Sequence, residues 1–142
     1  GYKYKIQKKI LQKIKIISLN LHISYLPWNK GADPNFWSFA ERTPRGVSIH
    51  EINDKIDEGP VIYRRKIAYK TSDTLFSSYK HLLTSIESLF FDKWENLKNN
   101  NYEKKMITEK GSFHNSKDIE NYTHFLSAGW DTKVKKIIGI AK

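Results

Sequence analysis

With 142 residues, the chain is long enough for one domain with a hydrophobic core and too short for two ordinary domains. Its 39% hydrophobic and 13% aromatic residues are typical of a folded protein and exclude an intrinsically disordered one. The absence of cysteine excludes disulfides and thiolate metal sites and fits a cytoplasmic protein, and no apolar stretch reaches the length of a membrane span.

The formal net charge of +10 raises the question of nucleic-acid binding. Only four of the 25 basic residues are arginines, although surfaces that read bases or clamp phosphates favour arginine. The lysines are scattered among many isoleucines and asparagines, a bias typical of genomes low in G+C. The charge is therefore weak evidence for nucleic-acid binding, and it would help to attract an anionic substrate.

The first part of the chain predicts a helix, a strand and a short second helix. Apolar residues at helical spacing predict a helix within residues 1–14, and the β-branched run at 15–19 predicts a buried strand. Proline and glycine mark an irregular segment at 27–31. A short helix is expected at 33–40, with Asp33 as its N-cap.

Two further strands and a long helix follow. Alternation over 46–52 predicts a half-buried strand, and 60–67 predicts a second strand antiparallel to it, because a short turn at 53–59 joins them. An N-cap cluster at 71–74 and a sustained apolar stripe predict a helix that ends near Leu97.

The strand predicted at 15–19 raises a question about completeness. It is apolar on both faces, which is typical of a strand in the middle of a sheet between parallel neighbours. The two later strands are expected to pair with each other, so its own neighbours are not found in the sequence that follows. The chain also begins at Gly1, within a loop that leads to a core helix. We therefore expect an α/β domain without its N-terminal βαβ half.

Three polar side chains are predicted to gather beyond the carboxyl end of this strand. Asn20 and His22 follow the strand directly and Asp57 lies in a later turn, and chemistry in open α/β sheets gathers at that end of the strands. There the Asn20 amide can donate to a carbonyl oxygen, and His22 can take a proton or stabilise an oxyanion. Asp57 can hold the imidazole in one tautomer and raise its pKa.

The residues around these three resemble a known family. Asn20-Leu-His-Ile-Ser-Tyr-Leu-Pro27, then Gly31 and Asp57-Glu-Gly-Pro60, match in order and spacing the motif of the folate-dependent formyltransferases. This family includes methionyl-tRNA formyltransferase, phosphoribosylglycinamide formyltransferase and the sugar N-formyltransferases. The segments that look most like bacterial sugar N-formyltransferases are 28–37, 111–114 and 129–131.

The resemblance implies an α/β fold, namely the C-terminal part of a Rossmann-like formyltransferase domain with a central parallel strand, an antiparallel strand pair and flanking helices. It implies transfer of a formyl group from 10-formyltetrahydrofolate to an amine, most closely that of an amino sugar on a nucleotide. The three polar residues above would be the catalytic ones. The catalytic core would span 1–100, and 101–142 would form a C-terminal extension with a short helix at 118–126.

The resemblance also implies binding residues. The pterin of the donor would lie between the loop at 1–6 and the turn at 53–57, and the sugar nucleotide would lie across the strand ends. The residues implied for the donor are Tyr4, Ile6, Asn53, Lys55, Ile56 and Asp57. Those implied for the substrate are Trp28, Lys30, Asp33 and Pro34. No metal is expected, because His81, His114 and His124 show no spacing typical of metal ligands.

Several alternatives stay open at this point. An activity like that of methionyl-tRNA formyltransferase or phosphoribosylglycinamide formyltransferase would use the same motif. An inactive truncated remnant or a basic interaction module would also contain the motif, inherited from an ancestral enzyme without a catalytic role. Taken singly, Asp57 can be an ordinary turn residue, Trp28 a packing residue and His50 a structural residue of its strand. A homodimer is one possible oligomeric state, and the sequence selects neither the sugar nor the nucleotide.

Overall fold

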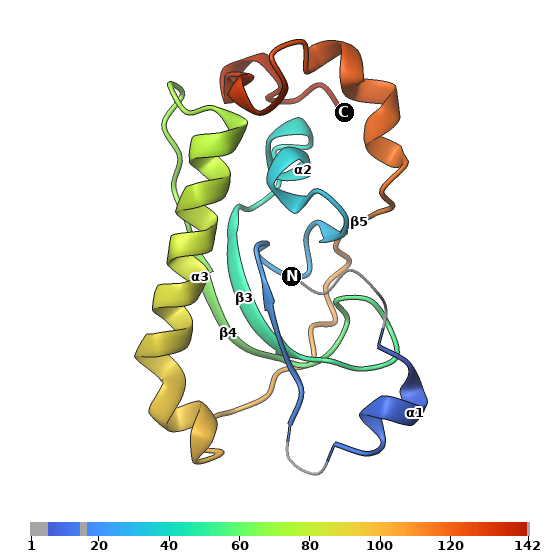
Figure 1. Ribbon diagram of the computed structural model, residues 1–142, viewed down its shortest axis with the longest axis vertical. Helices are drawn as coiled ribbons and strands as arrows, with labels where there is room; N and C mark the ends of the chain where they lie inside the picture. The colour runs from blue at the N-terminus through green and yellow to red at the C-terminus, as the bar shows by residue number, and fades with distance from the viewer. Residues whose placement is uncertain (1–5, 15–16, 142) are drawn as a thin grey trace.

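The computed structural model describes residues 6–14 and 17–141. A curved three-stranded sheet lies at its centre in the order β1-β3-β4, and both neighbouring pairs are antiparallel (Figure 1). The strands are β1 (Leu19–His22), β3 (Gly46–Glu51) and β4 (Val61–Lys66). The long helix α3 (Leu75–Lys98) packs against this sheet and supplies most of the core beneath it.

The strands confirm part of the sequence prediction and correct another part. β3 and β4 form the expected antiparallel pair. The strand predicted at 15–19 lies later, as β1, and residues 15 and 16 are outside the described part of the chain. Within that part, β1 pairs with β3 and the pairing is antiparallel, whereas the sequence predicts parallel neighbours. Leu21 on β1 is 44% exposed, so this strand is not buried on both faces.

Helix α3 begins and packs as the sequence predicts. Thr74 is its N-cap, and a capping box joins it to Ser77: the Thr74 hydroxyl accepts the Ser77 N–H, and the Ser77 hydroxyl accepts the Thr74 N–H. The apolar stripe of the helix faces β3. The core formed there contains Val47, Ile49, Leu82, Ile86, Leu89 and Leu97. Because alternate residues of a strand face opposite sides, the other residues of β3 point away from α3.

A second core surrounds the short helix α2 (Pro34–Ala40), which lies where the sequence predicts it. Asp33 stands at the N-cap position, but its φ of 51° is left-handed and its side chain makes no capping hydrogen bond, so the predicted side-chain cap is wrong. The buried residues of this core are Phe36, Trp37, Phe39, Ala40, Leu75, Val134 and Ile137. Phe36 and Trp37 therefore pack in this core, and Phe36 also lines a pocket beside it.

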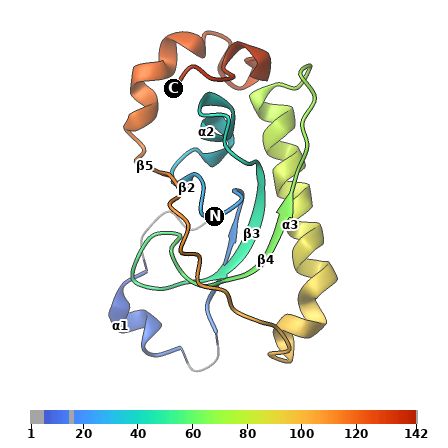
Figure 2. The same ribbon diagram turned by 180° about the vertical axis from the view of Figure 1, so that it is seen from behind.

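The C-terminal part of the chain wraps around the second core, at the top of Figure 1. It contains three 3₁₀ helices, η1 (Asp118–Phe125), η2 (Gly129–Asp131) and η3 (Val134–Lys136). The first of them occupies the position of the short helix predicted at 118–126. Ahead of it, β5 (Phe113–His114) pairs in parallel with β2 (Lys30–Gly31), and Figure 2 shows the two side by side.

The N-terminal helix is shorter and more exposed than the sequence predicts. α1 spans only Lys8–Leu11 and contains no buried residue, and Ile10 is 47% exposed. It is therefore not a core helix. Among the residues that the structure describes, no helix is both long enough and apolar enough to cross a bilayer.

Candidate active site

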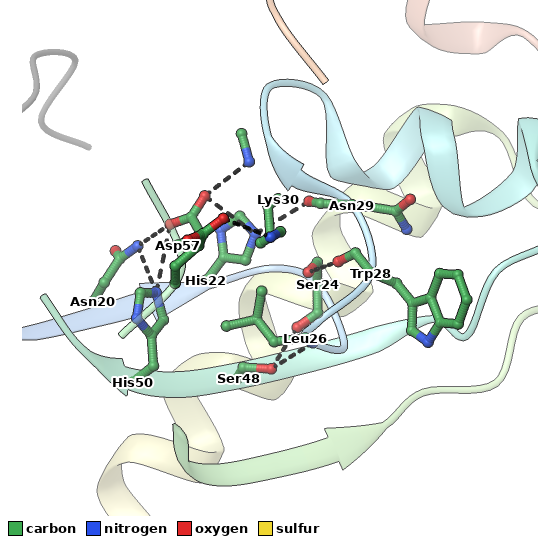
Figure 3. Close-up of polar contacts among 12 residues, drawn as sticks. Asn20, His22, Ser24, Leu26, Trp28, Asn29, Lys30, Ser48, His50 and Asp57 are labelled. Carbon is green, nitrogen blue, oxygen red and sulfur yellow. Dashed lines mark hydrogen bonds and ion pairs between the residues drawn. The ribbon is translucent and has the colours of Figure 1, made fainter. Parts of the chain in front are cut away.

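The structure brings Asn20, His22 and Asp57 together, as the sequence predicts, and adds His50 to them (Figure 3). The sequence predicts Asn20 and His22 beyond the end of the strand, and this is wrong: both lie within β1, two residues apart, and so share one face of it. The antiparallel register places Asn20 opposite His50 on β3, on the face turned away from α3. Asp57 reaches the same place from the turn between β3 and β4, where its φ of 52° is left-handed.

The Asp57 carboxylate is the centre of the cluster. Its Oδ1 accepts a hydrogen bond from Asn20 Nδ2 at 2.9 Å, and its Oδ2 accepts the Gly31 N–H at 2.9 Å. Burial alone would raise the pKa of this carboxyl, but in the acid range where it titrates the contact with His50, the charges of both imidazoles and the Gly31 N–H together lower the pKa to about 2. Asp57 is therefore ionised at neutral pH.

The Asn20 amide is oriented by its two partners. Nδ2 lies 2.9 Å from Asp57 Oδ1 and 3.1 Å from His50 Nε2. His50 Nδ1 lies 2.8 Å from the Glu51 carbonyl oxygen, which can only accept, so Nδ1 carries the proton and Nε2 accepts from Asn20. The reverse amide orientation would place Asn20 Oδ1 against the carboxylate and is excluded by repulsion. Both amide hydrogens of Asn20 are thus engaged.

His22 is 8% exposed and its Nε2 faces two acceptors. The Asn29 carbonyl oxygen lies 3.3 Å away and Asp57 Oδ2 lies 3.7 Å away. These acceptors favour the tautomer that is protonated at Nε2, which leaves a lone pair on Nδ1. The sequence predicts a raised pKa for His22, and this prediction is wrong: burial lowers the pKa, and its effect outweighs the opposing charge of Asp57. His22 is therefore neutral at pH 7.

These pKa shifts predict a loss of stability in acid in two steps. Below about pH 6.5, the unfolded chain protonates His22 more readily than the folded chain does, so the free energy of unfolding falls. Ionised Asp57 contributes ~2–3 kcal/mol above pH 4, which is lost as the pH falls towards its folded pKa of about 2. Urea unfolding of wild type and Asp57→Asn across this pH range checks both steps. An equal acid dependence below pH 4 in the two proteins would contradict the second.

The residues that the resemblance implies for the donor lie partly together. Asn53, Lys55 and Asp57 line a pocket of about 210 Å³, together with Met106 and Ile107 from the C-terminal part of the chain. Two further members of the set differ. Ile56 is 46% exposed and does not line this pocket, and Tyr4 lies outside the described residues. Ile6 is half-buried at the start of the described chain.

The residues implied for the substrate divide between two places. Asp33 and Pro34 line a larger pocket of about 560 Å³ between α2, α3 and the C-terminal part of the chain. Partial burial raises the pKa of Asp33. Lys30 lies instead at the smaller pocket, where its Nζ bonds Glu58 Oε1 at 2.9 Å. Trp28 is half-buried and lines neither of these two pockets.

Sequence reasoning missed three residues of this region. His50 was indistinguishable from a structural strand residue, and only the register with β1 places it at the cluster. Tyr79 and Trp130 form an aromatic wall of the larger pocket, with ring centroids 5.3 Å apart. The resemblance of residues 129–131 to sugar N-formyltransferases was the one signal for Trp130, whereas Tyr79 looked like part of the core stripe of its helix.

The cluster of Asn20, His22, His50 and Asp57 reaches the smaller pocket directly and the larger one only through a neighbour in the chain. Asp57 lines the smaller one, and Ile23, which follows His22 in the chain, lines the larger one. In the part of the chain that the structure describes, no three acidic or histidine side chains gather in a way that could hold a metal ion.

Comparisons of sequence identify the family of the chain. The model of the Formyl transferase family matches residues 1–92. The dTDP-4-amino-4,6-dideoxyglucose formyltransferase of Mycobacterium bovis is 30% identical over 102 residues, which cover 72% of the chain and 44% of that relative. The methionyl-tRNA formyltransferase of Wigglesworthia glossinidia brevipalpis is 36% identical over 76 residues, or 52% of the chain and 24% of the relative. The chain thus spans less than half of each relative.

Solved structures show the same fold. The formyltransferase PseJ from Anoxybacillus kamchatkensis, in complex with UDP-4,6-dideoxy-4-formamido-L-AltNAc and tetrahydrofolate, superimposes with a TM-score of 0.96 and is 45% identical, covering 100% of the chain and 75% of PseJ. Methionyl-tRNA formyltransferase from Clostridium thermocellum shares the mixed α/β fold, with a TM-score of 0.65 at 15% identity. Since the family model matches well over half of the chain and includes the whole Asn20, His22 and Asp57 cluster, the chain belongs to the formyl transferase family.

Proposed function

We propose that this protein transfers a formyl group from 10-formyltetrahydrofolate to the amine of an amino sugar carried on a nucleotide. The observation that carries the proposal is the cluster itself: a neutral, buried His22 beside an ionised Asp57, with the Asn20 amide on the same carboxylate. Formyl transfer needs a base for the amine proton and a donor for the carbonyl oxygen, and these groups supply both.

His22 is proposed as the base. When the amine attacks the formyl carbon, a C–N bond forms, the carbonyl electrons move to oxygen, and the nitrogen must lose a proton. The lone pair on His22 Nδ1 is the group that accepts it. Asp57 then faces the imidazolium through Nε2 and stabilises the new charge at 3.7 Å. The proton leaves again with the donor nitrogen when its bond to the formyl carbon breaks.

Asn20 is proposed as the donor to the developing oxyanion. Both of its amide hydrogens are engaged, one by Asp57 and one by His50. Binding of the formyl donor therefore has to exchange one of these bonds for a bond to the carbonyl oxygen. The bond to His50 is the easier one to give up, because its acceptor is a neutral nitrogen and not a carboxylate.

The two pockets suggest where the substrates bind. The smaller pocket at the turn 53–57 is proposed for the folate donor, and the larger pocket, with Asp33, Tyr79 and Trp130, for the sugar nucleotide. Both are walled by the proposed core, residues 1–100, and by the proposed extension, residues 101–142. PseJ, which is 45% identical across the chain and was crystallised with a formamido sugar nucleotide and tetrahydrofolate, supports this choice of substrates.

An assay of formyl transfer tests the proposal. The purified protein is incubated with 10-formyltetrahydrofolate and a panel of UDP- and dTDP-linked 4-amino-4,6-dideoxy sugars, and products are identified by mass spectrometry. We expect one or more formamido sugars and an equal amount of tetrahydrofolate. The same sugars with an acetylated amine are the control and should not react. Transfer to methionyl-tRNA but to none of the sugars, or transfer to neither, would overturn the proposal.

A further inference from the structure

One short segment, residues 29–32, contacts two of the catalytic side chains through its backbone. The Asn29 carbonyl oxygen lies 3.3 Å from His22 Nε2, and the Gly31 N–H donates to Asp57 Oδ2 at 2.9 Å. Figure 3 shows Asn29 and Lys30 of this segment beside the imidazole of His22. The position of the segment therefore governs the orientation of both the imidazole and the carboxylate.

Residues 111–114, more than 80 positions later in the chain, hold this segment in place. The Asn29 N–H donates to Ser112 Oγ at 2.8 Å, and the Lys30 N–H donates to the Ser112 carbonyl oxygen at 3.0 Å. The Ser112 hydroxyl in turn donates to Asn29 Oδ1 at 3.1 Å. One serine thus bonds the backbone and the side chain of the residue whose carbonyl faces His22.

The contact between the two segments is close. The Ala32 N–H donates to the His114 carbonyl oxygen at 2.9 Å. Gly31 has a φ of 84°, and a Cβ built on it would lie 2.3 Å from that same oxygen. Only glycine permits both this backbone conformation and this approach. The pairing of β2 with β5 therefore leaves little freedom for the N–H that binds Asp57.

The Asn29 side chain is fully buried, and both its nitrogen and its oxygen are hydrogen-bonded. It is 0% exposed, and its backbone has a left-handed φ of 55°. Its Nδ2 donates to Thr43 Oγ1 at 2.8 Å, and its Oδ1 accepts from Thr43 and from Ser112. A buried amide costs stability unless its hydrogen bonds are made. Here they anchor the residue from two sides.

We propose that Asn29 and Ser112 are positioning residues for formyl transfer: together they hold the Asn29 carbonyl against His22 Nε2 and so keep Nδ1 unprotonated. The role in catalysis rests on the proposed function. Besides this carbonyl, the groups that face the imidazole are Asp57, at 3.7 Å, and His50, with ring centroids 6.2 Å apart. Ser112 lies in the C-terminal extension, so the extension would help to set the geometry of the reaction.

Variants of the two residues test the effect on the reaction. Ser112→Ala removes the bridging hydroxyl, and Asn29→Gly removes the amide while keeping a residue that tolerates the left-handed φ. We expect kcat to fall about tenfold in each, with KM nearly unchanged, because small misplacements of a reacting group cost rate and not binding. Ser112→Thr keeps the hydroxyl and should restore kcat. Ser116→Ala, an exposed serine of the same region, is the matched control and should behave as wild type.

The imidazole nitrogens give a readout that does not depend on activity. In ¹⁵N NMR spectra of the folded wild-type protein, the ring nitrogens of His22 should have the chemical shifts of a single tautomer, protonated at Nε2. In the Ser112→Ala and Asn29→Gly variants, these two chemical shifts should lie closer together, as in a mixture of the two tautomers. If both variants keep the ¹⁵N chemical shifts of His22 and the kcat of wild type, the inference is overturned. It is also overturned if the variants lose activity only to the extent that they unfold. If wild type transfers no formyl group but the shifts change, the positioning is supported and the proposed function is overturned.

Discussion

Replacement of His22 by alanine is expected to lower kcat for formyl transfer by on the order of 10²- to 10⁴-fold, the usual contribution of a positioned general base. The reason lies in the geometry. The imidazole is buried and neutral, its Nε2 faces the Asn29 carbonyl and Asp57, and its Nδ1 lone pair is the proposed proton acceptor.

The measurement is kcat with 10-formyltetrahydrofolate and the amino-sugar nucleotide that the panel identifies, with circular dichroism to establish folding. His124→Ala is the matched control, since His124 is exposed in η1, away from the cluster, and should retain wild-type kcat. A folded His22→Ala variant with kcat close to that of wild type would rule out His22 as the base.

Asp57→Asn is expected to lower kcat on the order of 10³-fold, because loss of the carboxylate affects every member of the cluster. The charge that raises the pKa of His22 disappears, so the imidazole becomes a weaker base. The carboxylate also accepts from two donors, Asn20 Nδ2 and the Gly31 N–H. A carboxamide has one oxygen and one NH₂ group, so one of these donors would face another donor and lose its bond.

A second consequence is a loss of stability at neutral pH, since an unpaired buried donor costs about 1–3 kcal/mol. Chemical unfolding at pH 7 and steady-state kinetics together measure the two effects. Glu87→Gln, which makes the same carboxylate-to-amide change at an exposed position of α3 and lines neither pocket, is the control and should change neither quantity. If Asp57→Asn is folded and keeps its kcat within twofold of wild type, the carboxylate has no part in the reaction.

Much of the fold was predictable because its signals are local. The apolar stripe and N-cap cluster of α3, the alternation of β3 and the turn before β4 all depend on residues close together in the chain. The same is true of Asn20 and His22, which share a face because they are two residues apart on one strand. Asp57 was predictable through the ordered motif that it shares with them.

Other expectations failed because they depended on surroundings that the chain builds from distant parts. The pKa of His22 is lowered and not raised, because the tertiary structure buries the ring and desolvation outweighs the nearby carboxylate. The first strand pairs antiparallel with β3, although its composition is typical of a strand between parallel neighbours. The N-terminal helix has the spacing of a core helix, but no buried residue.

The sequence by itself determined the family motif, the order of the main helices and strands, and three of the four side chains in the cluster. Only the tertiary structure decided that His50 joins them, that Ser112 holds Asn29 across 83 positions, and that Tyr79 and Trp130 wall one pocket. The physical reason is the range of the interactions. Helix and strand propensities are set by neighbours along the chain, whereas strand register, burial and contacts between distant segments are set by packing of the whole domain.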